Sequence, residues 1–221
     1  ERLLTIRGLM ELKKADTAID ISEVEPAEEI VKRQRSAPVA KMILLVDAVI
    51  RKDMASAEKL LAEFPNRGFS GFMKPLLESW VRIGKSDGDG AINALAPLKK
   101  QSGLRVLYEL HAALLSDTAG MSDKAAGHYK LAAQNVRRST LRVVQGYGQH
   151  LERAGKTEQA RELYNTYLKE NPESVVLGPA LARLNKGQKP ALLVYTPAQG
   201  IAEALFNVAG TMTRQNSEQT A

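Results

Sequence analysis

Residues 141–174 read LRVVQGYGQHLERAGKTEQARELYNTYLKENPES and predict two helices joined by a tight turn. Two sets of residues recur at the spacing of one helix face: Val144, Tyr147, Gly148 and Leu151, then Ala160, Tyr164 and Tyr167. Small residues such as Gly148 and Ala160 let two helices cross at about 8–10 Å, and the larger side chains fill the remaining space. The stretch therefore predicts a helical hairpin.

The ends of both helices can be read from the same residues. Gly155 supplies the left-handed residue that ends the first helix, and the hydroxyl of Thr157 is expected to cap the second. Pro172 disfavours helical geometry in Asn171, so the second helix is expected to end there.

This hairpin resembles a tetratricopeptide repeat. The 34-residue unit of that family has a large residue, Leu-Gly and Tyr on its first helix, then Ala, an aromatic residue and a closing Pro. Val144 stands here in place of the usual Trp, and Tyr167 in place of the usual Ala. The resemblance covers most of residues 38–174 and the tail from Pro197. It implies an all-α fold in which hairpins stack into an α-α superhelix, or solenoid.

Three further hairpins precede this one. Gly120 and Ala125 each lie 35 residues before their counterparts Gly155 and Ala160, so two landmarks give one period. The predicted hairpins are 38–70, 71–103, 104–140 and 141–174. In the third of them, the apolar residues of the first helix fit best one residue out of phase, which predicts a connection one residue longer.

Two other positions depart from the repeat. Lys41 falls on a slot that should be apolar. The turn Gly84–Gly90 is expected to be longer than the reference turn, and it contains Asp-Gly-Asp-Gly. An EF-hand loop needs Glu at its twelfth position, which is Leu98 when counted from Asp87, so a plain glycine-rich turn is predicted.

The ends of the chain follow the repeat less closely. Residues 1–37 predict a degenerate N-terminal hairpin, 175–196 an extra helix and a linker, and 197–221 the first helix of a further, truncated repeat. Placing Ala221 in the slot of Ala160 puts Leu205, Val208, Ala209 and Met212 on the packing face of that helix. Because a first helix without its partner exposes its apolar face, we expect the sequence to be a fragment of a longer repeat protein.

Composition excludes several classes of protein. The absence of cysteine from 221 residues excludes disulfide scaffolds, cysteine-ligated zinc and thiolate catalysis. A net charge of +6, spread over 31 basic and 25 acidic residues, is too weak to imply nucleic acid. No apolar run reaches the roughly 18–20 residues of a bilayer span.

The sequence predicts no catalytic, cofactor or metal site. A phosphate loop, a nucleophile elbow and a dinucleotide fingerprint are all missing, so we expect no enzyme and no cofactor. The three histidines lie on separate predicted helices, which gives no pair at metal-ligand spacing. His150 is expected to be exposed, His111 partly buried, and His128 a surface or packing residue.

Binding is the function that the pattern favours. In the resemblance, the first-helix residues that do not pack on neighbours line a concave groove that suits an extended peptide or a partner helix. The candidate partner-binding residues are Arg142, Gln145, Gln149, Glu152 and Arg153. Their counterparts in the hairpin 38–70 are the apolar residues Met42, Val46 and Val49. Equally, the polar residues could be simply solvated and the apolar ones could cover neighbouring hairpins.

The leading hypothesis is a protein-interaction scaffold that binds a protein or peptide partner. One alternative is the superhelical, non-catalytic part of a larger cell-wall or glycosyltransferase-type enzyme. Another is an RNA-binding array, because residues 137–189 hold ten Lys or Arg against five Glu, although the polar positions do not recur between hairpins. A subclass of the tetratricopeptide family grips C-terminal carboxylates with Lys and Asn on successive first helices. Gln145 and Gln149 stand in the places of those residues here, so this carboxylate clamp is not expected. The chain resembles long bacterial tetratricopeptide proteins, many of them exported, which favours the periplasm slightly over the cytoplasm.

Overall fold

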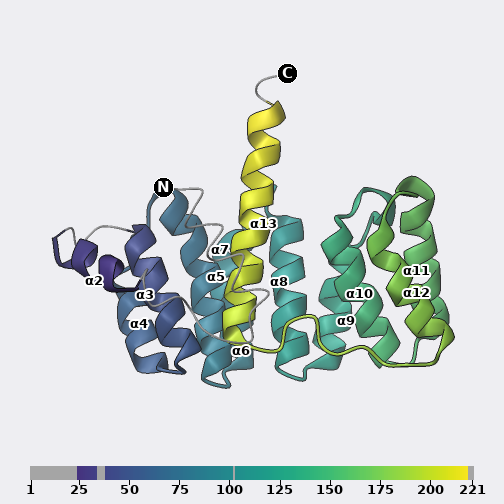
Figure 1. The fold of residues 1–221 in the computed structure, drawn as a ribbon, viewed down its shortest axis with the longest axis horizontal. Helices are drawn as coiled ribbons and strands as arrows, with labels where there is room; N and C mark the ends of the chain where they lie inside the picture. The colour runs from purple at the N-terminus through teal and green to yellow at the C-terminus, as the bar shows by residue number, and fades with distance from the viewer. Residues whose placement is uncertain (1–23, 34–37, 102, 219–221) are drawn as a thin grey trace. The chain divides into compact units, whose positions relative to one another are not determined.

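The computed structural model describes residues 24–33, 38–101 and 103–218, and these form helices and no strand (Figure 1). The all-α prediction is confirmed. Residues 1–23 of the predicted N-terminal hairpin lie outside the described residues. Two compact units are present: unit 1 comprises the described residues up to Leu98 and those from Thr196 onward, and unit 2 comprises Lys99–Tyr195.

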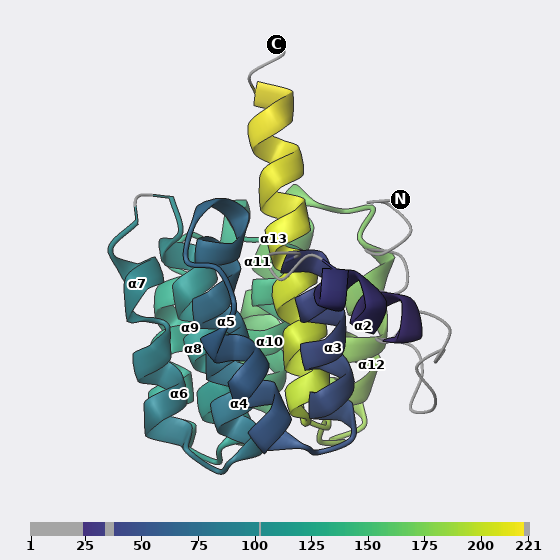
Figure 2. The same cartoon turned by 90° about the vertical axis from the view of Figure 1, so that its left-hand side faces the viewer.

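Unit 1 contains two helical hairpins and two additional helices. Its helices are α2 (Val24–Arg33), α3 (Pro38–Ile50), α4 (Met54–Ala62), α5 (Gly68–Gly84), α6 (Gly88–Ala94) and α13 (Pro197–Glu218), with α7 (Ala96–Lys99) at its boundary. Helix α3 pairs with α4, and α5 pairs with α6. Helix α13 packs against α3 and α5, so the chain returns to unit 1 at its C-terminal end (Figure 2).

The apolar face of α13 is covered, and its predicted exposure is wrong. Ile201, Ala204 and Val208 are buried, whereas Leu205 and Ala209 of the predicted face are half-buried. The cover comes from α3 and α5, which lie more than a hundred residues earlier in the sequence. The pattern on α13 therefore fits a helix packed on these two helices.

Unit 2 contains the other two hairpins. Its helices are α8 (Arg105–Thr118), α9 (Ser122–Ala132), η2 (Val136–Arg138), α10 (Leu141–Arg153), α11 (Thr157–Glu170), η3 (Val175–Leu177) and α12 (Gly178–Asn185). Helix α8 pairs with α9 and α10 with α11, while α10 also contacts α9 and α12 contacts α11. None of the helices in the described ranges combines the length and hydropathy needed to cross a bilayer.

All four hairpin turns have the same length. Each turn has three residues, and the middle one is left-handed: Lys52 (φ 62°), Ser86 (φ 61°), Gly120 (φ 73°) and Gly155 (φ 74°). These positions are separated by 34 (86 minus 52), 34 (120 minus 86) and 35 (155 minus 120) residues. In each turn, the N–H of the next residue donates to a carbonyl five residues earlier, at 2.8–3.0 Å. The predictions of a longer turn at Gly84–Gly90 and of a longer connection after α8 are therefore wrong.

The residue that follows the left-handed position precedes the second helix of each hairpin. Asp53 and Asp87 stand there and accept hydrogen bonds from the N–H groups of Ser56 (3.0 Å) and Gly90 (2.9 Å). These hydrogen bonds lower the pKa of both carboxyls. In α11 the position belongs to Lys156, and no side chain makes a capping hydrogen bond. The predicted cap at Thr157 is wrong, because Thr157 is already the first residue of the helix.

Polar residues account for the apparent phase slip in α8. Glu109 and Ser116 lie 35 residues before Val144 and Leu151 and are 3% and 0% exposed. Glu109 is paired with His128 Nδ1 at 2.8 Å, and Ser116 Oγ donates to a backbone carbonyl at 2.7 Å. The packing slots are thus kept in register, but they hold polar side chains that the apolar pattern did not include.

The same holds for Lys41. Its side chain is buried, and Nζ donates to the backbone carbonyl (3.2 Å) and the carboxylate (3.0 Å) of Glu63. A lysine can occupy this apolar slot because its ammonium group is paired at the end of α4.

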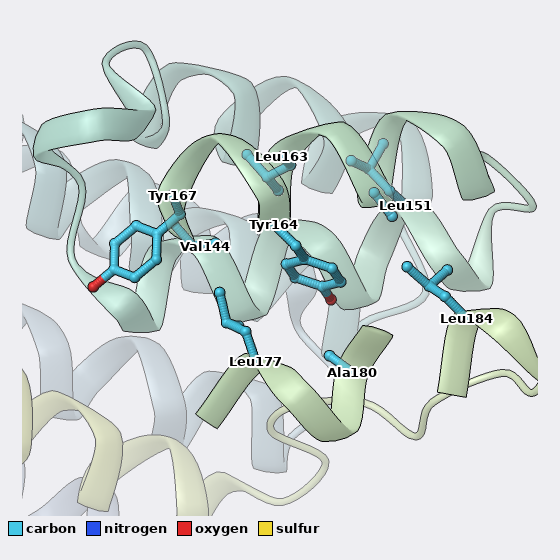
Figure 3. Close-up of a cluster of buried hydrophobic side chains, with 9 residues drawn as sticks. Val144, Leu151, Leu163, Tyr164, Tyr167, Leu177, Ala180 and Leu184 are labelled. Carbon is cyan, nitrogen blue, oxygen red and sulfur yellow. The ribbon is translucent and has the colours of Figure 1, made fainter. Parts of the chain in front are cut away.

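In the hairpin of α10 and α11, the predicted packing residues Val144, Leu151, Ala160, Tyr164 and Tyr167 are buried. A buried cluster joins α10, α11, η3 and α12 (Figure 3), formed by Val144, Leu151, Ala160, Leu163, Tyr164, Tyr167, Leu177, Ala180 and Leu184. A Cβ on Gly148 would overlap the ring of Tyr164, which explains why this slot is glycine. Tyr147 is half-buried and stacks on Tyr129 of α9.

Candidate functional site

Helix α10 has two buried sides and a third side lined by polar residues. A Cβ on Gly146 would lie 2.8 Å from the ring of Tyr129 in α9, and Gly148 lies against Tyr164 in α11. The polar face of α10 consists of Arg142, Gln145, Gln149 and Arg153, which are half-buried and spaced along one side of the helix. Four of the five predicted partner-binding residues thus share one face.

Glu152, the fifth predicted residue, is not on this face. It is 4% exposed, and its carboxylate accepts hydrogen bonds from Tyr164 Oη (2.7 Å) and from Arg183 Nε (2.9 Å) and Nη2 (2.8 Å). Arg183 comes from α12, so the carboxylate of Glu152 connects α10, α11 and α12. Its role is structural.

An extended segment of the same chain lies against α8 and α10. Residues 190–195, here named the crossing segment, have no regular secondary structure (Figure 1). Arg153 Nη1 donates to the carbonyl of Ala191 (3.1 Å), and Thr118 Oγ1 donates to the carbonyl of Val194 (2.9 Å). Val194 is buried, and a Cβ on Gly146 would lie 3.4 Å from Leu193.

The two donors occupy equivalent positions in successive hairpins. Thr118 and Arg153 are 35 residues apart, which is the spacing of the two turn glycines. Their acceptors are three residues apart in the crossing segment. Side chains at one repeat position therefore hold the backbone of an extended chain, which is a geometry suited to binding peptides largely independently of their side chains.

Arg153 is oriented by a buried acid behind it. Asp117 of α8 is paired with Arg153 Nη2 and with His150 Nδ1 (2.9 Å), and it accepts a hydrogen bond from Tyr129 Oη (3.3 Å). His150 is 4% exposed, so the prediction that it is exposed is wrong. The error arises because His150 points toward the preceding hairpin, where Tyr129 and Asp117 cover it.

Both hairpins of unit 2 contain the same arrangement of buried polar groups, here named the acid–tyrosine–arginine latch. The acid of the first helix is Asp117 or Glu152, and the tyrosine of the second helix is Tyr129 or Tyr164. Both pairs are 35 residues apart. The arginine comes from a later helix: Arg153 binds Asp117, and Arg183 binds Glu152. Sequence reasoning missed the latch, although the matched spacing of the acids and tyrosines was visible.

The other two histidines of the chain are at least partly buried. His128 is half-buried and bonded to Glu109, and His111 is fully buried. Within the described part of the chain, no three His, Asp or Glu side chains converge in a way that could hold a metal ion. The polar face of α10 and the crossing segment are thus the features that point to a function.

Comparisons of the chain with protein-family models, with curated proteins and with solved structures find no match. The function proposed below therefore rests on the geometry of α8 and α10.

The buried tyrosines of the latch, Tyr129 and Tyr164, are expected to make the protein less stable at alkaline pH. Burial raises the pKa of Tyr129 and Tyr164, and the charges of Asp117 and Glu152 raise it further. The unfolded state therefore releases the phenolic protons first, above about pH 10. Below about pH 10 the full contribution of both tyrosines to stability is present. Above that pH, each tyrosine lowers the free energy of unfolding by about 1.4 kcal/mol per pH unit.

Urea unfolding from about pH 7 to about pH 11.5 checks this expectation. Tyr129→Phe and Tyr164→Phe should each make the decline above pH 10 shallower by about that amount, and they should leave the trend below pH 9 unchanged. Equal slopes in the wild type and both variants would contradict the assignment.

Proposed function

We propose that this protein is a tetratricopeptide-like scaffold that binds an extended segment of a partner protein on the first-helix faces of α8 and α10. The repeat assignment is supported by the turns at intervals of 34, 34 and 35 residues, which match the 34-residue unit of that family. It is also supported by the small residues Gly148 and Ala160, which are placed where that family needs close helix packing. In that family the first helices of stacked units line a concave groove, which is the kind of surface proposed here for the partner.

One observation carries the binding proposal: Arg153 and Thr118 donate to the carbonyls of Ala191 and Val194 in an extended segment. The crossing segment takes up Arg153, Thr118 and Gly146, and it supports the proposal as an example of an extended backbone held by the first-helix faces of α8 and α10.

The partner segment lies beside the crossing segment on the N-terminal half of the polar face. Arg142, Gln145 and Gln149 are half-buried there, and their side chains supply both donors and acceptors to a peptide backbone. Two glutamines and an arginine favour a neutral or acidic extended peptide over a basic one.

Selection from a library of random linear peptides against the full chain tests the proposal. The selected peptides are then measured against the triple variant Arg142→Ala, Gln145→Ala, Gln149→Ala. We expect binding to weaken at least about tenfold, which corresponds to the loss of about 1.4 kcal/mol from several hydrogen bonds.

A matched triple variant on α11 is the control. Gln159→Ala, Glu162→Ala, Lys169→Ala removes three exposed polar side chains from the second helix of the same hairpin and is expected to leave affinity unchanged. The proposal fails if the library yields no binder or if both triple variants bind equally well. Tight, salt-sensitive binding of random-sequence RNA, measured in parallel, would favour the RNA-binding alternative instead.

A further inference from the structure

The net positive charge of the chain is concentrated in unit 2. Residues 99–195 hold 15 Lys or Arg and 8 Asp or Glu, which gives a net charge of +7 (15 minus 8). The other residues hold 16 Lys or Arg (31 minus 15) and 17 Asp or Glu (25 minus 8), which gives −1. The excess of positive charge therefore belongs to the unit that contains the polar face of α10.

Burial of the acids makes the surface of the first helices in unit 2 still more positive. The acidic side chains of α8 and α10 are Glu109, Asp117 and Glu152, and they are 4%, 9% and 1% exposed. Each of the three is already paired with a histidine or an arginine. The exposed acids of unit 2 lie on the second helices α9 and α11 or just after α11, and they are Asp123, Glu158, Glu162, Glu170 and Glu173. Helices α8 and α10, which the structure describes in full, thus present cations and no exposed carboxylate.

Exposed cations gather at the end of unit 2 where the first helices begin. Because each hairpin reverses the chain, α8 and α10 both begin at the end opposite the hairpin turns. Residues 90–108 and 124–151, which lead into these two helices, contain no Asp or Glu. The exposed cations of this end, here named the basic edge, are Lys99, Lys100, Arg105, Lys130 and Arg137.

The arginines of the basic edge keep donors that face water. Arg105 Nε lies 4.0 Å from the carboxylate of Glu109, and Arg137 Nε lies 3.5 Å from that of Glu170. The two arginine side chains are nevertheless 67% and 69% exposed. A guanidinium has five N–H donors, so each can accept a second carboxylate from a ligand. Arg142, the second residue of α10, joins the basic edge to the polar face of that helix.

The aromatic residues beside the basic edge favour an acidic peptide over RNA. Proteins that hold single-stranded RNA stack its bases on exposed aromatic rings. Tyr108 of α8 is 7% exposed, and Lys99 Nζ lies 5.7 Å from the centre of its ring. Tyr147 of α10 is half-buried and stacks on Tyr129. The tyrosines of these two helices are thus poorly placed to stack bases, whereas the cations are well placed to bind carboxylates.

We propose that the partner segment carries a run of acidic side chains, which binds the basic edge while the rest of the segment lies along the polar face of α10. This inference rests on the function proposed above and adds the charge and the placement of the ligand. The acidic run lies at the end of the segment that is over the start of α10. Charge complementarity of this kind speeds association and fixes the register of the complex, and salt screens it.

Two synthetic peptides test the inference against the full chain. The Glu peptide joins a stretch of Ser, Thr and Gln residues to a run of glutamates, and the Gln peptide has glutamines in place of the glutamates. Both are amidated at the C-terminus, so that the negative charge comes from side chains alone. Each is made with the run at its N-terminal and at its C-terminal end, because either chain direction can place the run over the basic edge. Fluorescence anisotropy measures the affinities.

We expect the Glu peptide to bind at least about tenfold more tightly than the Gln peptide at about 50 mM salt, in one of the two chain directions. The advantage should fall below about twofold at about 500 mM salt, because the charges are then screened. The triple variant Lys99→Glu, Lys100→Glu, Arg137→Glu should lose the advantage at low salt as well.

A second triple variant, Lys124→Glu, Lys156→Glu, Lys186→Glu, is the matched control. It changes the net charge by the same amount at three exposed lysines outside the basic edge, and it should keep most of the advantage. Circular dichroism and thermal unfolding check that both variants fold as the wild type does.

The possible results separate this inference from the proposed function. Equal affinities of the Glu and Gln peptides, or an advantage that persists in the basic-edge variant, would overturn the inference. Tighter binding of poly(U) RNA than of the Glu peptide, lost in the same variant, would overturn it in favour of RNA. Library peptides that depend on the polar face but show no excess of Asp or Glu would overturn it and leave the proposed function standing. Binding of the Glu peptide through the basic edge that the polar-face triple variant does not weaken would instead count against the proposed function.

Discussion

Replacing Arg183 with methionine is expected to lower the free energy of unfolding by about 3–5 kcal/mol, the cost of leaving a buried charge without its partner. The reason is an asymmetry of burial within the latch: the Glu152 side chain is 1% exposed, whereas that of Arg183 is 22% exposed. Loss of the arginine strands a carboxylate in the core with Tyr164 as its remaining donor. Chemical unfolding monitored by circular dichroism measures the effect.

The converse substitution is expected to cost less, because Arg183 can turn toward solvent when Glu152 is replaced by methionine. The double variant Glu152→Met, Arg183→Met should recover most of the loss, since apolar residues of similar volume often replace a buried ion pair at little cost. Arg161→Met removes a half-buried arginine whose hydrogen bond to Asn185 is exposed to solvent, and it should change stability by less than about 1 kcal/mol. A double variant as unstable as Arg183→Met alone would show that packing, and not the unpaired charge, explains the loss.

The period of the repeat could be predicted only where glycine marks it. Gly120 and Gly155 are readable because glycine is the usual residue at a left-handed helix end. Lys52 and Ser86 adopt the same conformation, although it costs a residue with a Cβ about 1–2 kcal/mol. The glycine signal of a helix end was therefore absent at the left-handed position of the first two hairpins, and the turn Gly84–Gly90 of the second was expected to be longer than it is.

The apolar pattern of the first helices was harder to interpret. In α10 the apolar residues mark packing within the hairpin, but in α5 the stripe through Trp80 marks the face under α13. A helix with two covered faces gives a periodicity that sums both, so a single-face template does not separate the residues that pack within the hairpin from those that lie under another helix. Local sequence carries no information about which distant helix supplies the cover.

The polar contacts of the candidate site could not be predicted from the sequence, for a related reason. Arg142, Gln145 and Gln149 could be assigned to one face because helical spacing fixes it. Glu152 lies one position from Arg153, yet its partner Arg183 is 31 residues away and belongs to α12. A carboxylate near the end of α10 can be exposed to solvent or paired with an arginine of α12. The spacing of residues on α10 does not predict which of the two occurs.

Replacing Gly148 with alanine is expected to destabilise the protein by about 3 kcal/mol, although alanine is the better helix former by about 1 kcal/mol. The new methyl group would overlap the ring of Tyr164, which is fully buried in the core of α10 and α11 (Figure 3) and held by Glu152. The ring cannot move aside without breaking that hydrogen bond. Thermal and urea unfolding measure the change.

Gly127 provides the matched control for this substitution. It lies inside α9, is exposed, and has no atom within 4 Å of the position of a Cβ. Gly127→Ala is therefore expected to stabilise the protein by about 0.5–1 kcal/mol, the helix-propensity difference alone. Tyr164→Leu, which removes the ring, should make Gly148→Ala less costly than it is in the wild type. Equal effects of the two glycine substitutions would mean that Gly148 is not required by the close approach of α10 and α11.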